Sequence, residues 1–361
     1  MSEGDVRRTS ALDVGRLRTG LTITVAIGVT VGLGVTFATG SKAVLTSILK
    51  LPVGWLLLSL ALSALSWVGQ GLGFAALTTR GVRGQLLRMT AAFLGGDFAA
   101  LVTPFGSGGI PAGVFCLTRE GLSAGESSAI IAMHSLLTGS FFLVVGVIAA
   151  IVMPLESSGS RMIVWSGIGA IAVVLVFVVL LAIRPHVATA WLNRTLSGSW
   201  LKRLLGEKRQ ARLVAAVDRE ATQFAGDVQT LMRERPSQLA LSFFGLFVSR
   251  VCLVVCLPVI MLGLGWRGEI LPLLATAVGA MALAIVSPTP GGSGAVEAAT
   301  AALLATQAPM AIAGAATLLW RAVTYYTEVI AGWLMFTRYL AMRPRAPEPA
   351  SRELPTSSAG S

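Results

Sequence analysis

Two short glycine-rich strings carry the residue types of an anion-binding turn. TPFGSGG occupies residues 103–109 and TPGGSGA occupies residues 289–295, with five of seven positions identical. A glycine-rich turn that begins a helix exposes backbone N–H groups, and the helix dipole adds partial positive charge there. Both strings therefore predict turns that cradle a phosphate group without charged side chains. The candidate turn residues are Thr103, Pro104, Gly106, Ser107, Gly108, Pro288, Thr289, Pro290, Gly291, Gly292, Ser293 and Gly294.

A helix is expected to begin within each string. In the second, Ser293 is the expected N-cap and Gly294 the first helical residue. In the first, Gly108 and Gly109 precede Pro111, a residue type favoured in the first helical turn.

A few ionisable side chains lie in strongly apolar sequence, where each is a functional candidate because burying charge in a membrane is costly. Arg250 and Arg321 suit a phosphate group, since a guanidinium can donate two parallel hydrogen bonds. The alternative for both is a salt bridge that locks helix packing. Arg321, Tyr325 and Glu328 follow at i, i+4 and i+7, which predicts one polar stripe on a helix.

The acidic residues and one histidine leave several roles open. Glu297 lies about one turn into the second half-helix, so it could fill the turn in the absence of substrate, carry a proton, or pair with an arginine. Asp97, His134 and Glu328 are candidates for a proton relay, because an unperturbed histidine titrates near neutrality. A hydrogen-bonded packing role is the more common alternative for His134.

The composition indicates that these residues belong to an integral membrane protein. The 361 residues are 54% hydrophobic and 12% charged, with a mean hydropathy of +0.77, which is more apolar surface than one soluble core buries. The net charge of +11 would suggest nucleic acid in a soluble protein. Here 22 of the 28 basic residues fall on one side of the predicted topology and four on the other, so we expect cytoplasmic termini and no nucleic-acid partner.

Six apolar stretches reach the roughly 20 residues that a membrane-spanning helix needs. They lie at about 19–39, 52–78, 126–153, 162–183, 237–263 and 311–337. Two further apolar regions, 90–118 and 270–306, are each interrupted by a glycine-rich string, which predicts a re-entrant helical hairpin in each region. We therefore predict an all-α polytopic membrane protein of about six transmembrane helices plus two re-entrant hairpins.

The hairpins occur in equivalent places of two repeats, at about 52–153 and 237–337, whose predicted topologies are opposite. Such inverted repeats are typical of transporters, with the substrate site near the bilayer midplane. The alternative is that each Pro-Gly cluster only kinks a long helix. The repeats form one membrane domain, 19–340, which follows a cytoplasmic tail, 1–18.

Two segments are expected outside the membrane. Residues 184–236 form a basic cytoplasmic segment, and its amphipathic part, 197–233, is predicted to bind anionic inner-leaflet lipids or to pack on the bundle. Residues 341–361 form a Pro- and Ser-rich tail that we expect to be disordered.

Motifs of soluble enzyme chemistry are missing from the sequence, which contains no Walker motif, HExxH or GxSxG elbow. We therefore expect no cofactor, no metal site and a transporter rather than an enzyme. Cys116, Cys252 and Cys256 sit in apolar surroundings and are expected to be buried, inert thiols.

The second string and the last span carry a family resemblance. SPTPGGSGAVEAAT at 287–300 and WRAVTYYTEVIAGW at 320–333 resemble the signature of the lysylphosphatidylglycerol synthetase transmembrane-region family. TPFGSGG and CLTREGLSAGES at 116–127 are similar to the turn and following connection of that family. The resemblance covers about residues 20–340 and carries over to Pro288–Gly292, Gly294, Glu297, Arg321 and Tyr325.

The resemblance implies a membrane domain like the lipid-flipping half of the multiple peptide resistance factor, in the bacterial cytoplasmic membrane. Two departures matter: we expect no soluble aminoacyl-transferase domain, because the sequence ends soon after the last predicted span, and Pro111 to Gly113 stand where members often have a basic residue. We expect a translocase of an anionic phospholipid or polyprenyl-phosphate-linked lipid. The alternatives are a secondary transporter of a small anionic solute and a membrane-embedded transferase with a lipid-linked donor. A homo-oligomer and a separate lipid-modifying enzyme are the protein partners that we consider.

Overall fold

The computed structural model describes residues 42–78, 80–152 and 236–342, and four isolated positions between them, and all regular structure in this part is helical. The helices are α2 (Lys42–Leu49), α3 (Val53–Leu77), α4 (Leu86–Val102), α5 (Gly109–Arg119), α6 (Ala124–Val152), α11 (Pro236–Gly263), α12 (Ile270–Val286), α13 (Ala295–Ala305), α14 (Met310–Arg321) and α15 (Thr327–Ala341). Three short segments complete them: the 3₁₀ turns Pro104–Gly106 and Pro290–Gly292, and the π-helical turn Ala322–Tyr326.

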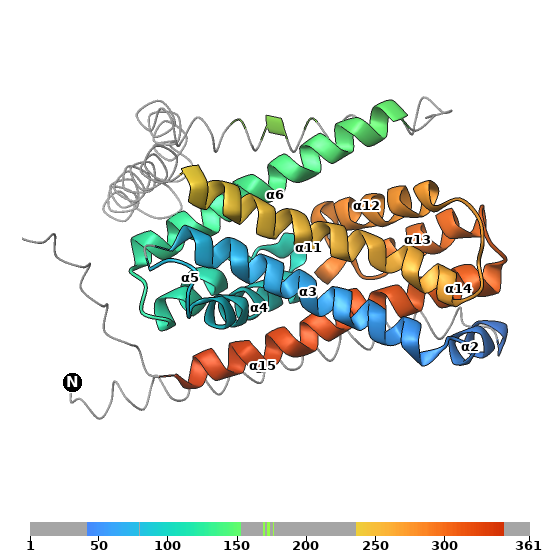
Figure 1. The fold of residues 1–361 in the computed structure, drawn as a ribbon, viewed down its shortest axis with the longest axis horizontal. Coiled ribbons are helices and arrows are strands. Elements are labelled where there is room, and N and C mark those ends of the chain that lie inside the picture. Colours follow the sequence, from blue (N-terminus) through green and yellow to red (C-terminus); the bar gives the residue numbers. More distant parts are fainter. Residues whose placement is uncertain are drawn as a thin grey trace, which may run out of the picture.

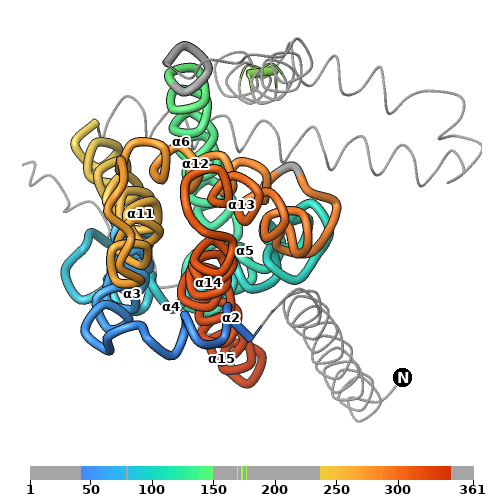
Figure 2. Tube along the Cα trace, turned by 90° about the vertical axis from the view of Figure 1, so that its right-hand side faces the viewer, coloured from blue at the N-terminus to red at the C-terminus, as the bar shows by residue number. Residues whose placement is uncertain are grey.

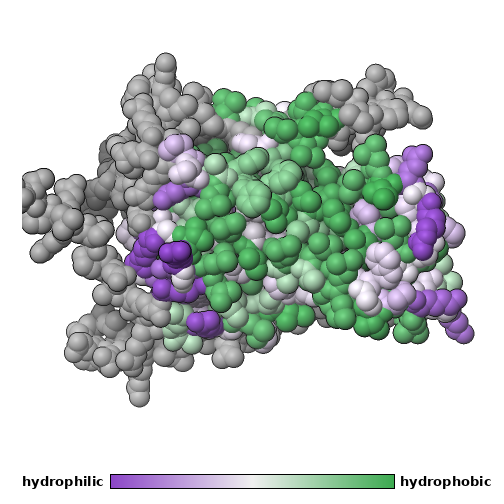
Figure 3. All heavy atoms as spheres, in the orientation of Figure 1, coloured by the Kyte–Doolittle hydropathy of each residue, from purple (hydrophilic) through white to green (hydrophobic). Residues whose placement is uncertain are grey.

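Three helices in the described part, α3, α6 and α11, are long and apolar enough to cross a membrane. They confirm the apolar helices predicted at 52–78, 126–153 and 237–263. The stretch predicted at 311–337 is one helical run from α14 through the π turn to α15. The stretches at 19–39 and 162–183, the first tail, nearly all of 184–236 and residues 343–361 lie outside the described residues. On the face shown in Figure 3, a broad apolar belt covers the middle of the bundle, with hydrophilic residues toward both ends.

The backbones of α3 and α11 approach closely because glycines face each other. A Cβ atom on Gly69 would lie 2.6 Å from the carbonyl oxygen of Gly245, and one on Gly245 would lie 2.5 Å from that of Gly69. Small residues that permit such approach are typical of helix pairs in membranes. Helices α3 and α11 therefore pack side by side along the long axis of the bundle (Figure 1).

Each glycine-rich string joins two packed helices into a helical hairpin. The arms are 17 and 11 residues long in both cases: α4 and α5 in the first hairpin, α12 and α13 in the second. The breaks predicted at 103–109 and 289–295 are therefore present. The hairpins lie toward opposite ends of the long axis (Figure 1), and their turns contact each other.

The last helical run contacts both hairpins. Its first part, α14, packs against α13, and its second part, α15, packs against α4 (Figures 1 and 2). Glycines again allow the close approach, since a Cβ atom on Gly332 of α15 would lie 2.6 Å from the carbonyl oxygen of Leu94 in α4. The run from Met310 to Ala341 therefore positions the polar groups described next.

Candidate functional site

The two turns follow the same backbone path. Phe105 has φ 54° and ψ 19°, and Gly291, its counterpart in the repeat, has φ 56° and ψ 19°. The next residues, Gly106 and Gly292, also have positive φ, at 66° and 70°. The left-handed region is costly for a residue with a Cβ atom, so Phe105 is the unusual member of this set.

The N-cap residue of the helix that follows each turn donates its backbone N–H to a protein side chain. In the first turn, the backbone N–H of Gly108 donates to Thr103 Oγ1 at 2.8 Å, and that hydroxyl donates to the carbonyl of Ala99 at 2.6 Å. In the second, the N–H of Gly294 donates to Glu297 Oε2 at 2.7 Å. The N-cap of α13 is Gly294, so the prediction of Ser293 as N-cap and Gly294 as first helical residue is wrong by one position.

A buried ion pair anchors the second turn to the last helical run. Arg321 donates from Nε to Glu297 Oε1 at 2.8 Å and from a terminal nitrogen to the carbonyl of Gly291 at 3.0 Å. The Glu297 and Arg321 side chains retain only 7% and 6% of their surface. Three roles were open for Glu297. In the structure its carboxylate both fills the turn and pairs with an arginine.

Tyr325 completes this group, which we call the turn cluster: Glu297, Arg321 and Tyr325. Its ring centroid lies 4.0 Å from the Arg321 guanidinium carbon, a cation–π contact. Its hydroxyl donates at 3.3 Å to the carbonyl of Leu101, in the last turn of α4. The ring also lies so close to Gly291 that a Cβ atom there would be 2.1 Å from a ring carbon. One helical run thus contacts both hairpin tips.

A second group brings charges together from three helices: Asp97 of α4, Arg250 of α11 and Glu328 of α15, which we call the charge centre. Arg250 interacts electrostatically with both carboxylates, and the carboxylates interact with each other. Arg250 Nε is buried without a hydrogen-bond partner, and the guanidinium carbon lies 5.4 Å from the Phe142 ring centroid. This arrangement leaves the Nε donor of Arg250 unused.

His134 of α6 lies beside the charge centre, within electrostatic range of Arg250. Its ring packs edge-on against Phe74, with centroids 4.8 Å apart, and Nδ1 is buried without a partner. The sequence-predicted ionisable residues therefore fall into two groups. The predicted stripe of Arg321, Tyr325 and Glu328 divides, because the π turn Ala322–Tyr326 rotates the residues that follow it about the helix axis.

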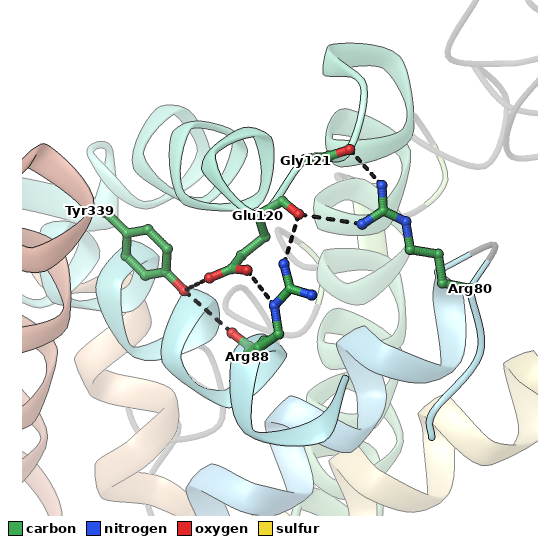
Figure 4. Close-up of polar contacts among 5 residues, drawn as sticks. All are labelled: Arg80, Arg88, Glu120, Gly121 and Tyr339. Carbon is green, nitrogen blue, oxygen red and sulfur yellow. Dashed lines mark hydrogen bonds and ion pairs between the residues drawn. The ribbon is translucent and has the colours of Figure 1, made fainter. Parts of the chain in front are cut away.

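A third polar group, at the base of the first hairpin, was missed by the sequence analysis (Figure 4). Glu120 retains 2% of its surface and accepts from Arg88 Nε at 2.6 Å and from the Tyr339 hydroxyl at 2.9 Å. Arg80 donates to the carbonyls of Glu120 and Gly121 at 3.3 and 2.7 Å. We call these residues the base cluster. The only sequence signal was the charged string TREG between two apolar stretches, which is equally typical of an exposed loop.

The three cysteines, Cys116, Cys252 and Cys256, are free and buried, as predicted. Among the residues that the structure describes, no group of three or more His, Cys, Asp and Glu side chains has the arrangement of a metal site.

The fold and these groups define a helical membrane protein with two glycine-turn hairpins and charged residues buried between its helices. A family model described as the lysylphosphatidylglycerol synthase TM region matches residues 23–332. The chain belongs to this family.

One curated relative is described as a UPF0104 membrane protein, from Archaeoglobus fulgidus. It is 23% identical over 242 residues, which cover 65% of this chain and 71% of the relative. No solved structure matches the chain.

Proposed function

We propose that the protein is a flippase-like translocase, which moves an anionic phospholipid or a polyprenyl-phosphate-linked lipid between the leaflets of a cytoplasmic membrane. The family supports a role with membrane lipids, because its name is that of the membrane region of a lipid-modifying enzyme. The observation that carries the proposal is the contact between two matching hairpin turns of an apolar helical bundle. Irregular backbone at membrane depth is tolerated where it lines a polar path.

In this proposal the hairpins enter the membrane from opposite sides as parts of an inverted repeat. Both termini and the basic segment 184–236 lie in the cytoplasm, where 197–233 binds anionic lipids. The head group passes between the two turns while the acyl or prenyl tails stay in the bilayer. Rocking of one repeat against the other would expose the head-group site to each leaflet in turn.

Arg250 is the side chain that we assign to the phosphate. One N–H group at the start of each helix, that of Gly108 before α5 and that of Gly294 before α13, is already bonded to Thr103 and Glu297 respectively. Arg321 is likewise bonded to Glu297 and Gly291. Arg250, in contrast, has a buried Nε without a partner, and a guanidinium is well suited to bind phosphate.

The test is a leaflet-exchange assay in proteoliposomes with one labelled lipid at a time, either phosphatidylglycerol or a polyprenyl phosphate. We expect exchange by the wild type and at least a tenfold slower rate for Arg250→Ala. Arg267→Ala is the matched control, because within the described part of the chain Arg267 bonds only two nearby backbone carbonyls, those of Leu262 and Trp266. Empty liposomes give the background.

Other outcomes would replace the proposal. Uptake of a small anion such as phosphate into the vesicles, without lipid exchange, would favour a secondary transporter. Covalent change of a lipid-linked donor would favour a transferase. Absence of exchange for every phospholipid and polyprenyl phosphate would refute the translocase.

A further inference from the structure

Arginines from four chain segments lie at the base of the first hairpin, where α4 begins and where α5 and α15 end. Figure 1 places these segments at one end of the bundle, and hydrophilic residues lie there in Figure 3. We call these residues the arginine group. They are Arg80 and Arg83 in the connection between α3 and α4, Arg88 of α4, Arg119 of α5 and Arg338 of α15.

Three of these segments meet at Glu120. Arg80 and Arg88 donate to its carbonyl oxygen at 3.3 and 3.2 Å, and Arg88 also donates to its carboxylate at 2.6 Å (Figure 4). The Tyr339 hydroxyl, from α15, donates to the same carboxylate at 2.9 Å. The side chain of Arg88 keeps 35% of its surface, so a ligand can reach it from outside.

Arg119 and Arg338 share the end of α15. Arg119 donates at 2.6 Å to the carbonyl oxygen of Met342, and the N–H of Met342 donates at 3.0 Å to the carbonyl oxygen of Arg338. The Phe115 ring centroid lies 4.9 Å from the Arg119 guanidinium carbon, a cation–π contact. Arg338 and Arg83 are exposed. Several of the guanidinium groups are therefore held in place by uncharged carbonyl groups and a ring, which leave their positive charge.

The arginine group carries more positive charge than the acidic residues around it cancel. Within residues 80–88, 119–126 and 336–342, five arginines accompany two glutamates, Glu120 and Glu126, which leaves a net charge of +3. This total is the same for every pattern of ion pairs among them. In the topology that we propose, this end of the bundle faces the cytoplasm. Clusters of basic residues at the cytoplasmic end of membrane helices attract anionic lipids.

Exposed apolar side chains beside the arginines favour a lipid over a soluble anion. Leu87, the neighbour of Arg88, is 79% exposed. On α15, Ile330 and Leu334 are 58% and 50% exposed, and they precede the exposed Arg338 by eight and four residues. Residues at this spacing share one side of a helix, so an apolar stripe ends at a guanidinium group. A phospholipid has the matching order of parts, an apolar chain followed by a phosphate.

We infer that the arginine group binds the phosphate head group of a resident anionic phospholipid of the phosphatidylglycerol type, whose acyl chain lies along Ile330 and Leu334. The site is separate from the turns, because α4 rises about 20 Å between Arg88 and Thr103. The inference therefore does not rest on the proposed translocase. A lipid bound there contacts helices of different chain segments in the folded state, so its binding should stabilise the protein.

A lipid titration tests this site. The full chain, purified in a neutral detergent, is titrated with phosphatidylglycerol or phosphatidylcholine, and thermal unfolding reports binding. We expect a saturable rise in the unfolding temperature with phosphatidylglycerol alone. The rise should be smaller in about 1 M salt than in about 0.1 M salt, because salt screens the attraction. Glycerol phosphate, which is the head group without the chains, should not reproduce the rise. An equal response to phosphatidylcholine or to glycerol phosphate overturns the inference.

Variants locate the binding at this end of the bundle. Arg83→Gln and Arg338→Gln each remove an exposed charge, and each should weaken the apparent affinity for phosphatidylglycerol about fivefold, because one basic residue is lost near the phosphate. The double variant should lose about 25-fold. Arg83→Lys and Arg338→Lys keep the charge and should bind nearly as the wild type. Without lipid, all these variants should unfold at the wild-type temperature.

The matched control removes two exposed charges from the opposite end of the bundle. Lys42→Gln combined with Lys50→Gln should change the affinity less than about twofold. Equal losses in the two double variants would show a general effect of charge, and wild-type affinity in the Arg83→Gln, Arg338→Gln variant would place the lipid elsewhere. Either result overturns the inference. The single variants decide the question if a double variant fails to fold. No step of these measurements involves transport, so failure of the proposed translocase leaves their outcome unchanged.

Discussion

Arg321 and Glu297 form a buried ion pair, 2.8 Å from Nε to Oε1, and the same carboxylate accepts a hydrogen bond from the backbone N–H of Gly294. The carboxylate therefore occupies the position at the start of α13 that an external anion would take, since a helix N-terminus favours negative charge. In this conformation the second turn is closed by the protein itself. The pair holds the tip of one hairpin to the last helical run.

Removal of either partner should destabilise the fold. Arg321→Ala leaves a buried carboxylate without its counter-charge, for which we expect a loss of about 3–5 kcal/mol in the free energy of unfolding. Denaturant unfolding in detergent micelles measures it. The double variant Glu297→Gln, Arg321→Ala should be more stable than the sum of the losses in Glu297→Gln and Arg321→Ala predicts, because neither charge remains unpaired. Strictly additive losses would show that the two residues are not coupled.

Gly291 is required by two independent features of the turn. Its φ of 56° is unfavourable for other residues, and a Cβ atom would lie 2.1 Å from a ring carbon of Tyr325. Gly291→Ala should lower the free energy of unfolding by more than the roughly 1–2 kcal/mol of the backbone term alone. Thermal unfolding compares it with Gly54→Ala, a position in α3 with no atom within 4 Å of the added Cβ. The control should be neutral or stabilised by up to about 1 kcal/mol. Equal stability of both variants would contradict the close packing.

Phe105 offers the reverse substitution in the first turn. Its φ is 54°, and its side chain is 66% exposed, so it makes little packing that could offset the backbone cost. We expect Phe105→Gly to change the free energy of unfolding by less than about 1 kcal/mol, because relief of the left-handed strain offsets the greater freedom of glycine in the unfolded chain. Gly291→Phe, the mirror exchange, should prevent folding. A loss of several kcal/mol in Phe105→Gly would mean that the ring itself is needed.

The glycine turns were predictable because their signal is local and occurs twice. Two strings that share five of seven residues produce the same backbone path, including φ values of 54° and 56° at residues 105 and 291. The apolar helices α3, α6 and α11 were predictable for the same reason, since length and hydropathy are read from one segment. The short helix α2 was not predicted, because the eight residues Lys42–Leu49 are too few to show a clear helical period.

The grouping of charges depends on contacts between distant segments. The choice of Arg321 rather than Arg250 as the partner of Glu297 follows from how α14 packs on α13. The separation of Glu328 from Arg321 follows from a π turn that the string AVTYY does not signal. Glu120 was missed because a glutamate between apolar stretches is usually solvated, and its partners Arg88 and Tyr339 lie 32 and 219 residues away.

The base cluster fixes the first hairpin at the end opposite to its turn. Glu120 stands at the C-terminus of α5, where the helix dipole disfavours a negative charge, so its burial depends on Arg88 and Tyr339. We expect Tyr339→Phe to cost about 1 kcal/mol, the usual value of one hydrogen bond. Glu120→Ala should cost more, about 1–3 kcal/mol, because it leaves the Tyr339 hydroxyl with a single acceptor, the Arg88 carbonyl at 3.3 Å. Arg88, about a third exposed, can be rehydrated, which limits the loss.

Thermal unfolding in detergent measures both losses, and amide hydrogen exchange locates them. The faster exchange should appear in α4, α5 and the end of α15 and leave α12 and α13 unchanged, because Arg88 lies on α4, Glu120 at the end of α5 and Tyr339 on α15. Glu269→Ala is the control, since this glutamate lies exposed before the second hairpin. Faster exchange spread equally over both hairpins would contradict a local role, and stability equal to the wild type in Glu120→Ala would contradict the cluster as an anchor. The expected pattern makes the first hairpin a unit held at its base by Glu120 and the second a unit held at its tip by Glu297.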